Sequence, residues 1–351
     1  MIANLWNTVW PILVAILFFG IIIMSHELGH FAFARIFKVK INEFSIGMGP
    51  LLFKKRRGDT DYSLRLLPIG GYCAMEGEEE DSEDTGAFNK KPCWQRAIII
   101  LAGATVNIIC GIIIMAIILG TSDLIGTPQI VKFADDAASK QGGLREGDRI
   151  VAIGSDRIYT EYDLSFYMMR DEDAVIDFLV ERNGEKEWIR SVAFDTSEVD
   201  GQTTVVYDFA IVGIEPTVGS VAKYALLDSL SIARIVWTSL FDIATLNFNL
   251  NDLSGPIGTV DIIADTTTDA VSTMDFSRLL TIMALIAINI GVFNLIPFPA
   301  LDGGRFILII FEGLTGKKLP TNVENAINNA GLMLLMALMV VVTVNDISKF
   351  F

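Results

Sequence analysis

The chain has 351 residues, of which 52% are hydrophobic and 20% are charged, and its mean hydropathy is +0.48. This composition excludes a disordered chain, and it argues against an ordinary soluble protein because the apolar residues are bunched into long runs. The net charge of -15 argues against a nucleic-acid partner, since an acidic surface repels phosphate.

Four apolar runs predict membrane-spanning helices: Ile12–Met24, Ala97–Leu119, Leu279–Ile296 and Gly331–Val344. The second run contains 23 residues without a formal charge, and about 20 apolar residues suffice to cross a bilayer. The other runs are shorter and must recruit flanking residues to span it. We therefore expect a polytopic α-helical membrane protein with about four transmembrane helices.

The distribution of charge predicts the orientation in the membrane. Residues 26–96 carry 11 Lys+Arg and 11 Asp+Glu, whereas residues 122–276 carry 27 Asp+Glu against 11 Lys+Arg. Lys and Arg, rather than net charge, mark the cytoplasmic loops of membrane proteins. The loop that includes Lys54–Arg57 is therefore expected in the cytoplasm, with the N-terminus and the acidic segment outside.

These patterns divide the chain into four parts. Residues 1–121 and 276–351 are predicted to form the two halves of a membrane core. Residues 122–216 are expected to fold as a small extracytoplasmic domain. Residues 217–275 begin with an amphipathic stretch from Leu226 to Leu240, which favours an interfacial helix, and continue as a linker with a turn at 254–258.

The loop after the first apolar run is rich in Gly and Pro, reading FSIGMGP at 44–50 and PIGGY at 68–72. Alternation bounded by these residues favours short strands and turns over a helix. One interpretation is a plain cytosolic hairpin. The other is a membrane-associated β-sheet or hairpin that presents an edge to an extended peptide, with Gly70 and Gly71 as candidate substrate-binding residues.

Residues 122–216 contain short apolar segments separated by turn signals. The expected strands are Ile130–Phe133, Ile150–Ile153, Val175–Val180 and Trp188–Val192. Asn183-Gly184 is a good hairpin turn, and a helix is expected near Glu161–Met169. These features predict a β-rich domain with one helix.

The stretch 142–153, GGLREGDRIVAI, resembles the core of the PDZ domain and implies one PDZ-like α+β domain. The alternative is a generic β-rich ectodomain. If the strand order is permuted, as in bacterial PDZ domains, the resemblance makes Val212, Gly213 and Ile214 a candidate carboxylate-binding loop.

The strongest signal for chemistry is His26-Glu27-Leu28-Gly29-His30, which continues the first apolar run. On a helix, His26 and His30 share a face and can bind one Zn²⁺, while Glu27 can act on a water molecule. The chain has two histidines in total, and both lie in this motif, so chance is a poor explanation. Polar groups in a membrane helix are functional by default.

A catalytic zinc needs three protein ligands and a water, and the chain has no third histidine. From Leu279 to Leu314 the chain is nearly all apolar, and as one helix it would be about 54 Å long, beyond a hydrocarbon core of roughly 30 Å. Pro297 and Pro299 must break this helix. Asp302 follows the break and is the expected third ligand.

Other residues near these motifs are rivals of Asp302 or affect its position. Gly303-Gly304 would let another helix approach Asp302 closely. Glu312 is the rival carboxylate, and the cysteines Cys73, Cys93 and Cys110 are interpreted as free thiols.

Two intramembrane amides have two interpretations each. Asn294, in the broken segment, either binds a peptide backbone or caps freed backbone groups at the kink, and Asn107 in the second run has the same alternatives. Asn294, Pro297 and Pro299 are candidate substrate-binding residues.

HELGH on a first span, paired with Asn294-x-x-Pro297-x-Pro299-x-Leu-Asp302-Gly on a later one, resembles the site-2 protease family of membrane-embedded zinc metalloproteases. FSIGMGP, PIGGY, SGPIG and the single PDZ-like domain resemble its bacterial regulator-of-sigma-E protease branch. The resemblance covers nearly the whole chain. It implies His26, His30 and Asp302 as zinc ligands, Glu27 as catalytic base, and a β-sheet associated with the membrane.

The resemblance also implies a multi-pass protein of the bacterial cell membrane, surrounded by membrane lipid, with its active site toward the cytoplasmic side. Substrates would be single-span proteins, such as anti-sigma factors already trimmed by an upstream site-1-type protease, or leftover signal peptides. The chain departs from the branch in carrying Ala104 where Pro is usual, and one PDZ-like domain where the best-known members have two.

Two other function classes are alternatives to an intramembrane metalloprotease. A non-catalytic membrane scaffold would use the PDZ-like domain to bind C-termini, and its function would survive Glu27→Gln. A metal transporter would need several polar residues along a pathway, and the apolar runs offer almost none beyond the motif.

Overall fold

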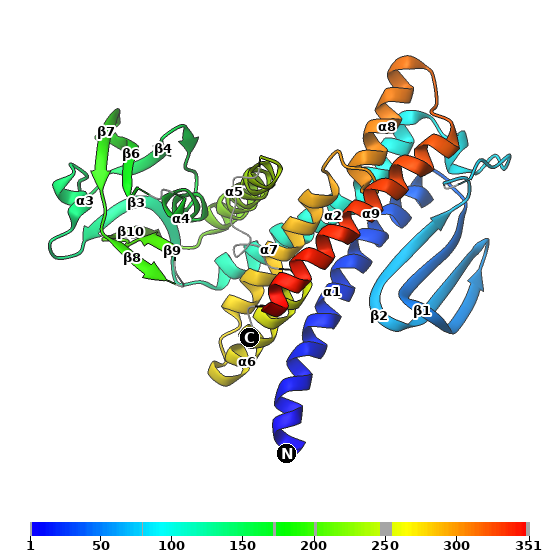
Figure 1. Cartoon of the computed structure of the whole chain (residues 1–351), viewed down its shortest axis with the longest axis horizontal. Coiled ribbons are helices and arrows are strands. Elements are labelled where there is room, and N and C mark those ends of the chain that lie inside the picture. The colour runs from blue at the N-terminus through cyan, green and yellow to red at the C-terminus, as the bar shows by residue number, and fades with distance from the viewer. Residues whose placement is uncertain (1, 79, 171–172, 200–201, 246–254, 349–351) are drawn as a thin grey trace. The chain divides into compact units, whose positions relative to one another are not determined.

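A computed structural model describes residues 2–78, 80–170, 173–199, 202–245 and 255–348 (Figure 1). The chain separates into two compact units. The first unit comprises residues 1–111 and 242–351, and the second comprises residues 112–241. Part of the predicted linker, residues 246–254, lies outside the described residues.

Four helices among the described residues are long and apolar enough to cross a membrane. They are α1 (Ile2–Ile36), α2 (Cys93–Thr121), α7 (Ser277–Asn294) and α9 (Thr321–Ser348). Each overlaps one of the four apolar runs, so the prediction of about four helices able to span a membrane is confirmed. Their exposed apolar side chains are those expected of helices that face lipid.

The long apolar stretch that ends at Leu314 is broken as expected. Helix α7 ends at Asn294, and helix α8 (Asp302–Thr315) begins after a connection that contains Pro297 and Pro299. Proline cannot donate a backbone hydrogen bond, and its ring obstructs the preceding turn of a helix. The break places Asp302 in the first turn of α8, where the positive end of the helix dipole favours a carboxylate.

Helix α6 (Pro256–Thr273) replaces most of the predicted linker. Gly255 is its N-cap and Pro256 its first residue, a position where the missing N–H of proline is not needed. The carboxylate of Asp346, on α9, accepts hydrogen bonds from the N–H groups of Gly255 (3.0 Å) and Gly258 (2.9 Å). The turn prediction is wrong from Pro256 onward, because the group that caps the helix comes from a distant part of the chain.

Strands β1 (Ile41–Arg57) and β2 (Thr60–Met75) form a sheet beside α1 (Figure 1). Residues 43–46 pair with residues 71–74 on one side and with residues 61–64 on the other. The two long strands therefore bend back on themselves and make more pairings than a plain hairpin. Strands in place of a helix are confirmed, but β1 and β2, of 17 and 16 residues, are longer than the short strands predicted. A short 3₁₀ helix, η1 (Phe88–Lys90), precedes α2.

The second unit contains a sheet with the strand order β10-β3-β4-β6-β7, and β5 pairs with β4. These strands are β3 (Ile125–Phe133), β4 (Arg149–Ile153), β5 (Asp156–Arg157), β6 (Val175–Arg182), β7 (Glu185–Ala193) and β10 (Phe209–Ile214). A separate pair is formed by β8 (Thr196–Val199) and β9 (Gln202–Val205), and the helices are α3 (Ala138–Gln141), α4 (Glu161–Met169) and α5 (Val218–Ala244).

The secondary structure predicted for this region is confirmed in its main features. Strands β3, β4, β6 and β7 contain the four predicted strands, and α4 has the predicted bounds. Asn183 and Gly184 have positive φ angles of 52° and 83°, as a type I′ hairpin turn requires. The helix predicted from the amphipathic stretch is part of α5.

The prediction that Val212, Gly213 and Ile214 form a loop is wrong. These residues lie in β10, where Gly213 is opposite Gly126 and Ile214 is opposite Ile125 of β3. A strand forms because the backbone groups of this segment find partners on β3, and no local sequence signal identifies these partners.

Helix α5 buries a carboxyl group, that of Asp228, which is 4% exposed. Burial, together with the negative charges of Glu161 and Asp163, raises the pKa of Asp228 to about 7, although the Thr160 hydroxyl opposes this shift by hydrogen bonding to the carboxylate. Arg234 and Ser231 of α5 contact Asp163 instead. The folded chain therefore holds a proton on Asp228 that the unfolded chain releases at lower pH.

We expect Asp228 to make the folded state less stable as the pH rises from about 4 to about 7, because the unfolded state binds fewer protons in that range. The slope should be at most about 1.4 kcal/mol per pH unit. Asp228→Asn should stabilise the full chain at pH 7 and change little at pH 4, as measured by thermal unfolding in detergent. The control is Asp135→Asn, on an exposed loop. A variant that keeps the pH dependence of the wild type would contradict this assignment.

Candidate metal centre

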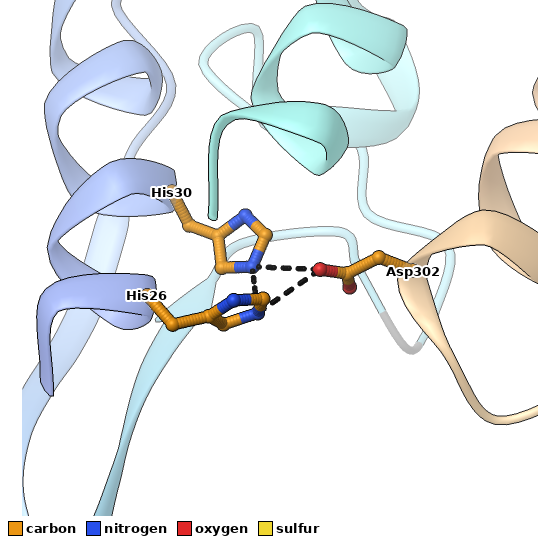
Figure 2. Close-up of side chains that lie close together, drawn as sticks. All are labelled: His26, His30 and Asp302. Atoms are coloured by element: carbon orange, nitrogen blue, oxygen red, sulfur yellow. Dashed lines mark hydrogen bonds and ion pairs between the residues drawn. The ribbon is translucent and has the colours of Figure 1, made fainter. Parts of the chain in front are cut away.

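Helix α1 presents His26 and His30 on one face, as their spacing predicts. Their Nε2 atoms lie 3.1 Å apart, and the two residues are 8% and 7% exposed. The rings are steeply inclined to one another, with an interplanar angle of 83° and centroids 4.7 Å apart. The rings therefore do not stack, and both Nε2 atoms point toward the same place (Figure 2).

Asp302 of α8 completes a cluster with the two histidines (Figure 2). Its Oδ2 lies 3.0 Å from Nε2 of His26 and 3.3 Å from Nε2 of His30. Among the described residues, these three side chains are the group of His, Cys, Asp or Glu placed to hold a metal ion. The rival carboxylate, Glu312, instead forms an ion pair of 2.6 Å with Arg96.

Gly303 and Gly304 position Asp302 in a way that differs from the prediction. A Cβ on Gly303 would lie 2.2 Å from the carbonyl oxygen of Ile296, and a Cβ on Gly304 would lie 2.2 Å from that of Phe298. The glycines therefore let the start of α8 pack against the connection that precedes it, where we had expected close contact with another helix.

The cluster fits a zinc ion. The Nδ1 atom of His30 lies 2.8 Å from the carbonyl oxygen of Ile99, which places the proton on Nδ1 and leaves the lone pair of Nε2 for a metal. Ligand atoms about 2.0–2.1 Å from a tetrahedral zinc lie roughly 3.3 Å from one another, close to the observed 3.0, 3.1 and 3.3 Å. Oδ2 of Asp302 is buried without a hydrogen-bond donor among the described residues, which is costly unless a cation binds it.

Helix α2 packs directly against the histidines at Gly103. A Cβ at this position would lie 2.5 Å from Nε2 of His30 and 2.8 Å from Cε1 of His26. One residue before His26, the hydroxyl of Ser25 donates a hydrogen bond of 2.6 Å to Oδ1 of the fully buried Asn107. Asn107 thus joins α2 to α1 beside the cluster.

Residues 71–75 of β2, the outer strand of the β1–β2 sheet, contact Glu27. Its Oε2 accepts a hydrogen bond of 3.1 Å from the backbone N–H of Cys73. The side chain of Met24 lies against Gly71 on the same strand. The β1–β2 sheet therefore contacts α1 at the His26–His30 motif.

A cavity of about 910 Å³ opens onto the cluster. His26, Glu27, His30 and Asp302 line it, together with Tyr72–Met75 of the outer strand, Arg305 of α8 and acidic residues of the loop that follows β2. Glu78 of that loop forms an ion pair with Arg305. The three clustered side chains and Glu27 therefore share one polar cavity with a strand edge.

The remaining candidate residues do not line this cavity in the described part of the chain. Asn294 donates a hydrogen bond of 2.9 Å to the carbonyl oxygen of Ile290, one turn earlier in α7, and its role stays a prediction. Pro297 and Pro299 lie in the connection before α8, and Gly70 and Gly71 lie in β2.

Four groups at the site were not anticipated as functional: the carbonyl of Ile99, the N–H of Cys73, Gly103 and Arg305. The two backbone groups carry no signal in the side-chain sequence. Gly103 does carry a signal, because a glycine inside an apolar helix often marks the close approach of another element. Arg305 lies one turn after Asp302, and its proximity to the site follows once α8 is known to begin at Asp302.

Known proteins are similar to this chain over nearly their whole length. Residues 14–338 match the pattern of peptidase family M50. A Clostridium acetobutylicum protein, provisionally named a zinc metalloprotease, is 35% identical over 342 residues, covering 96% of this chain and 97% of that protein. The zinc metalloprotease RasP of Shouchella clausii is 31% identical over 435 residues, covering 97% and 99% of the two chains. The regulator of sigma-W protease RasP of Bacillus subtilis is 26% identical over 419 residues, covering 96% and 98%. The chain therefore belongs to peptidase family M50, the site-2 protease family.

Proposed function

We propose that the chain is a zinc-dependent intramembrane protease that cleaves the transmembrane segments of single-span proteins. The observation that carries this proposal is the convergence of Nε2 of His26, Nε2 of His30 and Oδ2 of Asp302 within 3.3 Å of one another. His26, His30 and Asp302 are the zinc ligands in this proposal. The zinc metalloproteases among the relatives support the choice of metal.

Bound zinc supplies a Lewis acid that polarises a peptide carbonyl and makes water more acidic. Glu27 accepts the proton of the attacking water and later returns it to the leaving amine. The N–H of Cys73 holds one carboxylate oxygen of Glu27, which leaves the other oxygen for the proton transfer. His30 keeps the tautomer required for metal binding through its contact with the carbonyl of Ile99.

The substrate is held in an extended form before cleavage. A helical transmembrane segment hides its carbonyl groups in its own hydrogen bonds, so it must unwind before a peptide bond can react. Residues 71–75 form the outer strand of the β1–β2 sheet and line the cavity in part. An unwound substrate that pairs with this strand lies next to Glu27.

The name of one relative supports a substrate class. The Bacillus subtilis relative is named a regulator of sigma-W protease, which supports anti-sigma factors as substrates. In this proposal an upstream site-1-type protease trims them first, and signal-peptide remnants are the second class. The basic residues of the loop between α1 and α2 support a cytoplasmic position for the site. The protein is then a multi-pass protein of the bacterial cell membrane.

We assign residues 122–216 as an extracytoplasmic PDZ-like domain. The sheet order leaves β10, which contains Val212, Gly213 and Ile214, as a terminal strand. A terminal strand can pair with an extended peptide or C-terminus. In this proposal the three residues act through the strand edge, and the carboxylate-binding loop is not needed.

Metal content and cleavage, measured on the same detergent-solubilised protein, test the proposal. The substrate is a tagged single-span protein that lacks its ectodomain. We expect one zinc per wild-type chain, loss of cleavage after chelation, and recovery when zinc is returned. Asp302→Ala should lose both zinc and cleavage, whereas Glu312→Ala, the carboxylate paired with Arg96, should keep its zinc. A folded wild-type chain purified without chelator that contains no metal would overturn the proposal in favour of a scaffold.

A further inference from the structure

The β1–β2 sheet separates its apolar and charged residues along the strands. Its exposed apolar side chains are Ile46, Met48, Leu51, Leu52, Phe53, Leu64, Leu66 and Leu67. They include neighbours in sequence, such as Leu51 and Leu52, which point to opposite faces of a strand. A sheet with one face in water alternates apolar and polar residues instead. Both faces at this end of the sheet are therefore apolar.

The opposite end of the sheet is charged. In the strand register, Arg56 lies opposite Asp61, and Asp61 lies opposite Glu43. The turn at residues 58–59 lies at this end, while the bends near Gly49 and Pro68 lie at the apolar end. Along β1, the exposed side chains thus change within a few residues from apolar to basic, and the basic segment is Lys54–Arg57.

Contacts with α1 give the depth of each end. A Cβ on Gly20 would lie 2.5 Å from the carbonyl oxygen of Pro68, and Gly20 is near the middle of the candidate span Val9–Ile36. Cys73, further along the same strand, donates a backbone hydrogen bond to Glu27. Glu27 lies seven residues after Gly20, toward the C-terminal end of α1. The apolar end of the sheet therefore lies level with the middle of the span, and the charged end lies toward the cytoplasmic side of the proposed topology.

The charged side chain of Arg65 is compatible with this depth because protein groups accept its hydrogen bonds. Its guanidinium donates to Glu43 (3.0 Å), the Tyr72 hydroxyl (2.8 Å), the carbonyl of Gly49 (2.9 Å) and the Ser45 hydroxyl (3.1 Å). A charge at membrane depth needs partners of this kind.

The basic segment at the other end is mostly unpaired. Lys54 forms an ion pair of 2.9 Å with Asp61. Lys55, Arg56 and Arg57 are exposed, and in the part of the chain that the structure describes their side chains form no ion pair with a carboxylate. Three cations thus follow directly after an exposed apolar surface. Proteins that contact an anionic leaflet have the same order, with apolar residues in the hydrocarbon region and basic residues at the headgroups.

We propose that Lys55, Arg56 and Arg57 bind the headgroups of anionic phospholipids and thereby hold the sheet at a defined depth. This inference rests on the membrane placement in the proposed function. Each basic residue near an anionic surface contributes a preference of roughly fivefold. The sheet also holds Glu27 through Cys73, so its depth is linked to the position of the site.

The test is native mass spectrometry of the full chain in detergent, mixed with equal amounts of phosphatidylglycerol and phosphatidylcholine of the same acyl chains. The wild type should retain the anionic lipid in at least tenfold excess, since three basic residues contribute. Lys55→Gln, Arg56→Gln and Arg57→Gln together should bring the ratio close to one. The matched control removes the same charge from exposed residues of the other unit, with Lys132→Gln, Arg145→Gln and Lys186→Gln, and should behave as the wild type.

A second measurement does not depend on a variant. Raising the salt concentration from 0.05 M to 0.5 M should remove most of the preference of the wild type, since salt screens exposed charges. Equal retention of both lipids by the wild type, or a triple variant that keeps the wild-type ratio, would overturn the inference. Neither assay requires cleavage, and the Glu27→Gln chain should show the same lipid preference. A chain that prefers anionic lipid through these residues but lacks zinc would refute the proposed function alone.

Discussion

Replacing Glu27 with Gln is expected to lower cleavage by a factor of about 10²–10⁴ while one zinc stays bound, which is the range of effects for removing a general base. Gln has nearly the same size, and its side-chain oxygen can still accept the hydrogen bond from Cys73. It cannot take a proton from water. Because Glu27 is not one of the three converging side chains, the metal site should survive the substitution.

The measurement is the rate of cleavage of the tagged single-span substrate, with zinc determined on the same samples. Glu80→Gln is the matched control, since Glu80 lines the same cavity and is exposed. It removes one charge from the cavity without touching the glutamate next to the metal ligands. Wild-type cleavage by Glu27→Gln would remove Glu27 from the mechanism, and loss of zinc in this variant would show that it helps to bind the metal.

Gly103→Ala is expected to weaken zinc binding by one to two orders of magnitude and to slow cleavage by about 100-fold. The added Cβ would lie 2.5 Å from Nε2 of His30, so either the imidazole or the helix must move by about 1 Å, and displacements of that size near reacting groups cost about this much in rate. Helix propensity alone predicts the opposite, because Ala stabilises a helix by up to about 1 kcal/mol relative to Gly. The two effects can therefore be separated.

The control for this prediction is Gly120→Ala on the same helix, where an added Cβ meets nothing within 4 Å. Zinc affinity from competition with a chelator and the midpoint of thermal unfolding would be measured for both variants. Gly120→Ala should keep full activity and equal or greater stability. Gly103→Ala should keep its fold but lose zinc affinity. Unchanged zinc affinity in Gly103→Ala would mean that α2 does not pack against the histidines as described.

Much of the site was predictable because its residues carry local signals. The i, i+4 spacing of His26 and His30 requires only that α1 is helical, and a continuous apolar run makes it so. Asp302 was found from a length argument, since a helix through Pro297 and Pro299 would be too long for the bilayer. Four spans, four strands, one helix and a type I′ turn were likewise set by periodicity, glycine and proline.

Other features required contacts between residues far apart in the chain. Helix α6 was missed because its N-terminus is capped by Asp346, about 90 residues later. Val212–Ile214 form a strand because β3 supplies partners. A single sequence shows neither partner, so a linker and a loop were the reasonable expectations.

The sequence by itself determined that the chain has four candidate spans, which side chains can bind a metal, and that Glu27 accompanies them. Only the tertiary structure decided how these residues are held. It placed the carbonyl of Ile99 against His30, brought the N–H of Cys73 to Glu27, and packed Gly103 against both imidazoles. The physical reason is that two of these contacts are made by backbone groups, and the third depends on the absence of a side chain at Gly103. Backbone groups are alike at every position, so the sequence does not show which of them will meet a partner.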